Sequence, residues 1–112
     1  MTSAELQRQV KAALDTVLVP VSKDYSEHED IYPHVVYSEI SNVPALHSDN
    51  REKFFRAVYQ VAIVTDNDDY EDLESAVELA MLGLGFMRSD SVDIFDGNFN
   101  RVLRFTISVP KN

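Results

Sequence analysis

The chain has no cysteine and only three glycines among its 112 residues. Without cysteine, disulfides, thiolate metal sites and cysteine nucleophiles are all excluded. With so few glycines there is no glycine-rich phosphate-binding loop, and no GxSxG motif of a serine nucleophile is present. Basic residues are scarce too, since ten Lys and Arg stand against nineteen Asp and Glu, a formal net charge of −9. This balance argues against a nucleic-acid binder that relies on a general basic face, and we expect no sequence-specific nucleic-acid partner.

Long apolar runs are missing as well. The longest fall far short of the roughly 20 residues that span a bilayer, so we expect no membrane partner. The first residues, MTSAELQRQV, carry charge early and lack an apolar segment, so we expect no signal peptide. The length and an apolar share of 45% are ordinary for a globular protein, and we expect a single domain over residues 1–112.

The strongest pattern in the chain is a strand over Arg51–Asp66, REKFFRAVYQVAIVTD. Strand side chains alternate between two faces, and one face here is wholly apolar or aromatic. That face consists of Phe55, Ala57, Tyr59, Val61 and Ile63. The other face begins polar with Arg56 and Gln60 and becomes apolar toward its end. The pattern predicts a central strand with helices on one face and solvent or a partner on the other.

An amphipathic helix is predicted over Thr2–Leu18. Thr2 and Glu5 fit a capping box at its start, and Pro20 stops it. Its apolar positions follow helical spacing and are Leu6, Val10, Ala13, Leu14 and Val17.

A second helix is predicted within residues 65–86, after an acidic turn. Asp68 and Glu71 fit a second capping box, and Gly83 and Gly85 supply the stop. Its apolar stripe is Leu73, Val77, Ala80, Met81 and Leu84.

The remaining elements are three strands. Residues 34–40 alternate as a first strand, and 86–95 with 101–109 form a hairpin around an Asp-Gly turn. Residues 19–30 are predicted to be a polar connection. The fold class is therefore α+β, a two-layer sandwich with αββαββ order, in which two helices cover a mostly antiparallel four-stranded sheet.

Residues 41–50, SNVPALHSDN, are predicted to be a long loop, because Ser, Asn, Pro and Asp favour turns. The segment nevertheless contains Val43 and Leu46, apolar residues with no obvious core to enter. Exposed apolar residues in a long loop often serve binding. The alternative is that Leu46 folds back over a sheet edge. The two interpretations are weighted equally.

Catalytic and metal chemistry finds little support. His28, His34 and His47 lie in separate segments and show no zinc-ligand spacing. The acidic run over 66–72 suits a hard cation, but a charged helix N-terminus explains it fully. We expect no enzyme activity, no metal and no cofactor. The main basic concentration, Arg51, Lys53 and Arg56 with Arg101 and Arg104, suits contacts between subunits.

The layout resembles the tail-completion or tail terminator proteins of long-tailed bacteriophages and prophages, the minor tail proteins of head–tail joining. The resemblance covers nearly the whole chain. An N-terminal helix is followed by YPHVVYSEI, a long loop ending in SDNREKFFRAVYQVAIVT, an acidic-started helix running into GLGFMRSD, and the hairpin DIFDGNFNRVLRFTISV.

The resemblance implies a non-enzymatic virion assembly protein that forms a ring, commonly a hexamer. Such a ring caps the tail tube and joins it to the head, so its partners are itself, the tail-tube protein and head–tail connector proteins. The implied location is the virion tail or neck, assembled in the host cytoplasm. The implied interface lies in loop 41–50, which orders on assembly, and its neighbours: Val43, Leu46, His47, Arg51 and Arg56. The alternatives are a head-side connector component, a ferredoxin-like module that binds a small ligand, and a metal-dependent hydrolase.

Overall fold

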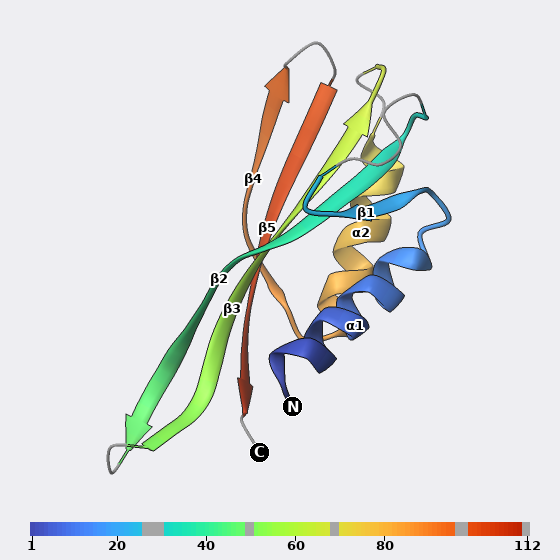
Figure 1. Cartoon of the computed structure of the whole chain (residues 1–112). Coiled ribbons are helices and arrows are strands. Elements are labelled where there is room, and N and C mark those ends of the chain that lie inside the picture. The colour runs from blue at the N-terminus through green and yellow to red at the C-terminus, as the bar shows by residue number, and fades with distance from the viewer. Residues whose placement is uncertain (26–30, 49–50, 68–69, 96–98, 111–112) are drawn as a thin grey trace.

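The protein folds as one sheet with two helices on one of its faces (Figure 1). The structure is a computed structural model that describes residues 1–25, 31–48, 51–67, 70–95 and 99–110, and of 44–48, 51–53, 95 and 99 it describes the backbone alone. The elements are α1 (Ser3–Asp15), β1 (Val21–Lys23), β2 (His34–Ser48), β3 (Arg51–Thr65), α2 (Glu71–Gly83), β4 (Met87–Phe95) and β5 (Phe99–Pro110).

The sheet has five strands in the order β1-β2-β3-β5-β4, which corrects two predictions. Only the α+β class is confirmed; the four-stranded sheet and the αββαββ order are wrong. The additional strand, β1, lies inside the predicted polar connection 19–30 and pairs in parallel with β2. It is held at both ends, since Val35 N donates to Pro20 O at 2.9 Å and Asp24 N donates to Tyr37 O at 2.8 Å. Three residues are too few to display a strand period in the sequence.

Strand β3 lies at the centre of the sheet, as predicted, and pairs with β2 on one side and β5 on the other. The predicted core face of β3 is confirmed, because its five side chains are at most 4% exposed. The helices close this face with Leu6, Val10 and Leu14 from α1 and Val77 and Met81 from α2, all fully buried. The opposite face of β3 carries no helix, which matches the predicted arrangement.

The predicted loop over residues 41–50 is a further correction. Strand β2 continues to Ser48 and β3 begins at Arg51, so the backbone of 41–48 is a strand. The turn-favouring residues are accommodated by irregularities in the β2–β3 register, which fall between Glu39 and Ser41 and on both sides of Leu46. A β-bulge adds a residue to one strand without ending the pairing, and it increases the local twist.

The helix ends follow capping chemistry in part. Thr2 caps α1 as predicted, because its hydroxyl accepts from the Glu5 backbone N–H at 3.1 Å. Gly85 ends α2 with φ of 102°, and the N–H groups of Gly85 and Phe86 donate to the carbonyls of Leu82 and Met81. This bonding pattern needs a left-handed residue after the helix, which glycine adopts without strain. The predicted capping box at Asp68 is wrong at the helix itself, because α2 has Tyr70 at its N-cap without a side-chain bond; Asp68 lies outside the described residues.

Tyr59 packs its ring in the core and bonds its hydroxyl to Glu39, a polar residue of β2. Its ring is fully buried and meets Phe86 edge-on, with ring centroids 5.6 Å apart. Its hydroxyl donates to a Glu39 carboxylate oxygen at 3.2 Å across the β2–β3 pair. Burial, followed by the negative charge of Glu39, raises the pKa of Tyr59 well above its usual value of 10.0. Both causes disfavour a tyrosinate, so the folded state retains the proton.

We therefore expect the protein to lose stability at alkaline pH through Tyr59. Above pH 10 the unfolded chain releases this proton while the folded chain keeps it, so the free energy of unfolding falls by about 1.4 kcal/mol per pH unit for this one group. Urea unfolding at pH 8, 10 and 11 measures the slope. Tyr59→Phe should unfold at a lower urea concentration at pH 8. Its free energy of unfolding should also fall less steeply above pH 10, because the contribution of this one proton is gone. Tyr25→Phe, at a side chain that is 70% exposed, should retain it. An unchanged slope in Tyr59→Phe would contradict the assignment.

Candidate functional site

The distal parts of β2 and β3 form an arm that extends beyond the rest of the fold. We define the arm as residues 43–48 of β2 and 51–56 of β3. At its base, residues 54–56 still pair with β5 and Phe55 belongs to the core, whereas residues 51–53 pair only with β2 in the described register. Figure 1 shows the two strands running past the start of α1, and the molecule measures 51 × 23 × 22 Å. A two-stranded ribbon alone is at best marginally stable in water, which makes the arm a candidate for contact with another chain.

The base of the arm is anchored to the N-terminal end of α1. The Asn42 side-chain amide donates to the Ser3 hydroxyl at 2.8 Å. The amino group of Met1 donates to the carbonyl of Pro110 at 3.3 Å. These two bonds mark where the helical layer ends, because both involve the first three residues of the chain. The arm therefore leaves the body of the protein from a defined point and in a defined direction.

The structure places all five predicted interface residues on the arm. Val43 and Arg56 are cross-strand partners, and both side chains are exposed. Leu46 pairs with Phe54. His47 and Arg51 lie nearer the end of the arm, where their partners are Glu52 and Ser48. The side chains of Leu46, His47 and Arg51 lie outside the description, so their role at an interface stays a prediction, as does the alternative in which Leu46 covers a sheet edge.

The outer edge of β2 is irregular along the arm. Strand β1 pairs with β2 only at Val35, Val36 and Tyr37, so the rest of β2 is an edge in the described sheet. Pro44 lacks a backbone donor, and the register shifts near it break the even spacing of hydrogen-bonding groups. Such features prevent uncontrolled strand pairing at exposed edges. Contacts made by the arm are therefore better served by its side chains than by strand addition along β2.

Two exposed leucines on α2 were missing from the predicted interface. Leu79 is 71% exposed and Leu82 is 44% exposed. Their exposure could have been predicted from the sequence, because neither leucine falls on the apolar stripe predicted for this helix. An amphipathic helix directs its off-stripe positions to solvent, and two leucines there form an uncovered apolar strip.

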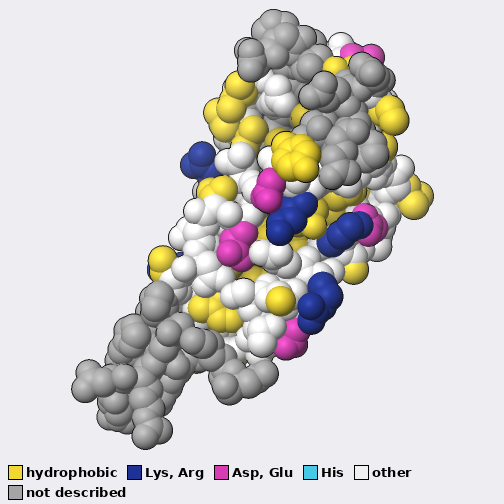
Figure 2. Space-filling view, in the orientation of Figure 1, with side chains coloured by type: hydrophobic (Ala, Val, Ile, Leu, Met, Phe, Trp, Pro, Cys, Tyr) yellow, Lys and Arg dark blue, Asp and Glu magenta, His cyan; other side chains and the backbone are white. Residues whose placement is uncertain are grey.

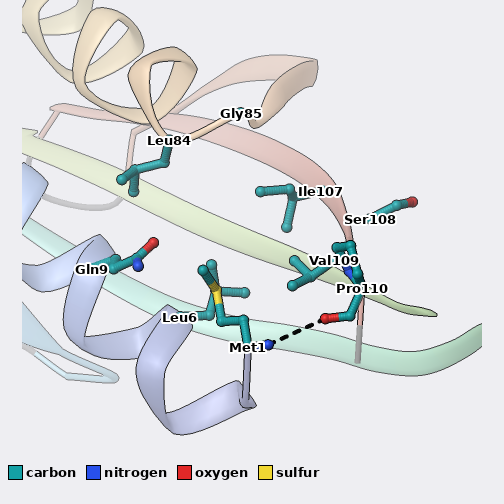
Figure 3. A pocket seen from close by; sticks show the side chains of 9 residues that line it. All are labelled: Met1, Leu6, Gln9, Leu84, Gly85, Ile107, Ser108, Val109 and Pro110. Carbon is teal, nitrogen blue, oxygen red and sulfur yellow. Dashed lines mark hydrogen bonds between the residues drawn. The ribbon is translucent and has the colours of Figure 1, made fainter. Parts of the chain in front are cut away.

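A shallow cavity of about 250 Å³ lies between the helices and the end of β5 (Figure 3). Its lining is mostly apolar and comes from Met1, Leu6, Gln9, Leu84, Gly85, Ile107, Ser108, Val109 and Pro110. Small-molecule pockets usually measure about 300–1,000 Å³ and carry several convergent polar groups. The element order also differs from the βαββαβ order of ferredoxin-like domains. Neither observation favours the small-ligand alternative.

A charged network holds α2 against the β4–β5 hairpin. Arg101 on β5 donates to Glu74 of α2 at 3.1 Å, to Asp93 at 3.0 Å and to Ser91 at 3.1 Å. Its guanidinium also lies 5.6 Å from the ring centre of Tyr70, a cation–π distance. Figure 2 shows basic and acidic side chains lying next to one another on the side in view. The network is well paired, so we interpret it as structural.

The histidines do not form a metal site in the described part of the chain. His34 is buried, and its Nδ1 lies 2.7 Å from the carbonyl oxygen of Ile31. His28 and the side chain of His47 lie outside the described residues, as do Asp68 and Asp69 of the acidic run. Among the residues with described side chains, no three His, Asp or Glu gather as metal ligands. None of the described helices is both long enough and apolar enough to span a bilayer.

Comparison with known proteins yields distant likenesses to solved structures. No protein-family model matches the sequence, and no curated protein matches it. One solved structure that the chain is similar to is that of the bacteriophage SPP1 gp17 protein, at 21% identity over 89% of each chain with a TM-score of 0.38. A likeness at this level does not assign a function, so the function proposed below is supported by the sequence resemblance and by the arm.

The network at Arg101 leads to a stability prediction. Its side chain is only 22% exposed, so Arg101→Met should lower the free energy of unfolding by about 2 kcal/mol through lost charge-assisted bonds. Arg104→Met is the matched control, since Arg104 is 47% exposed and lies 3.8 Å from Asp90. Its effect should be less than about 0.5 kcal/mol. Urea unfolding at neutral pH measures both, and equal losses would contradict a structural role specific to Arg101.

Proposed function

We propose that this protein is a non-enzymatic virion assembly protein of a long-tailed phage or prophage, acting in the manner of a tail terminator. In this role several copies associate into a ring that caps the tail tube and joins it to the head. The copies of the chain, the tail-tube protein and the connector proteins are its partners, and the virion neck or tail is its location. The head-side connector role is the nearest alternative.

The observation that best supports this proposal is the arm. A monomeric enzyme or ligand-binding domain has little use for a ribbon that extends beyond its own core, because ordering its backbone costs conformational entropy and residues 51–53 pair with one neighbouring strand alone in the described register. Contact with a neighbouring subunit would offset that cost. The arm is also the segment in which the resemblance locates the part that orders on assembly, and residues of the predicted interface come together on it.

Light scattering after gel filtration, over a range of protein and salt concentrations, tests the proposal directly. We expect a species near six times the chain mass of 12.7 kDa, either alone or when purified tail tubes of the source phage are added. The control is an unrelated protein tube, which should recruit nothing. A chain that stays monomeric and leaves the tail tubes unbound at high protein concentration would overturn the proposal.

Leu46→Asp should separate assembly from folding. A carboxylate on the arm places a desolvated charge in any interface formed there, so we expect the oligomer to be lost. Thermal unfolding should stay cooperative, with a midpoint within a few degrees of the original. Leu18→Asp, at a side chain that is 90% exposed and away from the arm, is the matched control and should assemble normally. A strongly lowered midpoint for Leu46→Asp would place Leu46 in the core and contradict the prediction.

A further inference from the structure

The sheet face turned away from the helices, here called the open face, carries an apolar band across four strands. Cross-strand partners share a face, and the described register aligns one such row through β2, β3, β5 and β4. That row is Val36, Ala62, Val102 and Val92. The next row adds Val64 on β3 and Ile94 on β4, beside the polar His34 on β2 and Asn100 on β5. Val92 and Ile94 are 46% and 48% exposed, Val36, Ala62 and Val64 are partly exposed, and Val102 is 6% exposed, so the band reaches solvent mainly on β4 in the isolated chain.

The open face is nearly free of acid, although the chain as a whole is strongly acidic. Among its described side chains the charged ones are Arg56, Arg104 and Asp90, as the register assigns them. Their sum is +1, whereas the whole chain carries −9. Arg56 is exposed and makes no ion pair with a described residue, and Arg104 lies 3.8 Å from Asp90 with both side chains about half exposed. Beside its apolar band, this face therefore presents cationic groups available to a partner.

The outer side of α2 has the complementary pattern. Its exposed positions recur at helical spacing and are Glu71, Asp72, Ser75, Leu79, Leu82 and Gly83. The first half of this stripe is acidic and the second half is apolar. Glu71 and Asp72 form no ion pair with any residue whose side chain is described, unlike Glu74 and Glu78, which bind Arg88. We call this set the α2 stripe.

We propose that the α2 stripe of one copy packs on the open face of the next copy. This inference rests on the proposed ring and identifies two further patches that would join its subunits, in addition to the arm. A helix rises 1.5 Å per residue, so Asp72 lies about 10 Å from Leu79 and about 15 Å from Leu82. On the sheet, Arg104 lies about 7 Å from Val102 and Arg56 about 20 Å from Ala62 along their strands. When the α2 leucines of one copy lie on the valine row of the next and the helix runs along the strands, the acids at the start of α2 therefore lie between Arg104 and Arg56.

Charge selects this pairing over its symmetric alternatives. Two open faces packed together would bring arginines toward arginines, and two α2 stripes would bring unpaired carboxylates together. The pairing of stripe with face joins unlike charges and covers both apolar surfaces. It is also heterologous, using a different patch on each subunit, and a heterologous contact repeated with a closing rotation makes a ring. In such a ring each sheet would have helices on both faces.

The absence of cysteine makes a crosslinking test clean. Leu79→Cys and Val92→Cys are made in separate chains carrying tags of different mass, mixed at several hundred micromolar and oxidised. We expect the mixed disulfide to form at least five times more abundantly than either symmetric disulfide, and to weaken as salt rises because the acids and arginines are screened. Leu18→Cys mixed with Val92→Cys is the control and should give only background. Symmetric products in excess, or a mixed product no greater than the control, would overturn the inference.

A second pair of variants tests the same contact without oxidation. Leu79→Asp places a charge in the α2 stripe and Val92→Asp places one on the open face, so neither variant should assemble alone. In a mixture, the intact stripe of Val92→Asp can pack on the intact open face of Leu79→Asp, so we expect a dimer that contains one chain of each. Circular dichroism and thermal unfolding verify that both variants fold. If only one variant loses assembly, or the mixture stays monomeric while both are folded, the heterologous contact is wrong.

These outcomes separate the inference from the proposed function. A ring that forms without the Leu79–Val92 crosslink would be consistent with the tail-terminator proposal but would contradict this contact. A crosslink that forms in open chains, with no closed ring and no binding to tail tubes, would support the contact and contradict the proposed function.

Discussion

The length of β3, paired along both edges, is the constraint on which the rest of this structure depends. Its fifteen residues extend about 50 Å, whereas each thirteen-residue helix covers about 20 Å. The core face of β3 is buried from Phe55 to Ile63, and the arm extends beyond that part. The open face is uncovered for a different reason, because both helices pack against the same face of the sheet. Both surfaces follow from where the two helices lie on the sheet.

Local pattern in the sequence was sufficient for several elements whose residues depend on close neighbours, although it misplaced the N-cap of α2. The alternation in β3 predicted its buried face, Thr2 and Glu5 predicted the start of α1, and Gly85 predicted the end of α2. It failed where pairing is non-local. Strand β1 has three residues, and its strand character comes from a parallel partner that no short-range period records. The Arg101–Glu74 contact, which joins residues 27 positions apart, was equally out of reach.

The misassigned loop shows how turn chemistry can mislead. Pro44 and its Ser and Asn neighbours favour irregular backbone, and irregular backbone is present, but as shifts within a continuous pairing rather than as a break. Strand β2 tolerates this because β1 leaves most of its outer edge without a described partner. Val43 and Arg56 were predicted as interface residues for separate reasons, one as an apolar residue of the loop and the other as part of the basic concentration. Their pairing comes from the register of the hairpin, which a loop assignment cannot supply.

The distribution of charge connects the fold to association. A net charge of −9 opposes the approach of identical chains at long range, so assembly is favoured at a surface that carries few acids. Strand alternation creates one, because the acids of α2 project from the helical layer while the described side chains of the open face include the valines, two arginines and a single acid, Asp90. Repulsion between the other, acidic surfaces of two copies then disfavours relative orientations that do not place this face against acidic residues. Solubility of the free subunit and directionality of its association can therefore arise from the same excess of carboxylates.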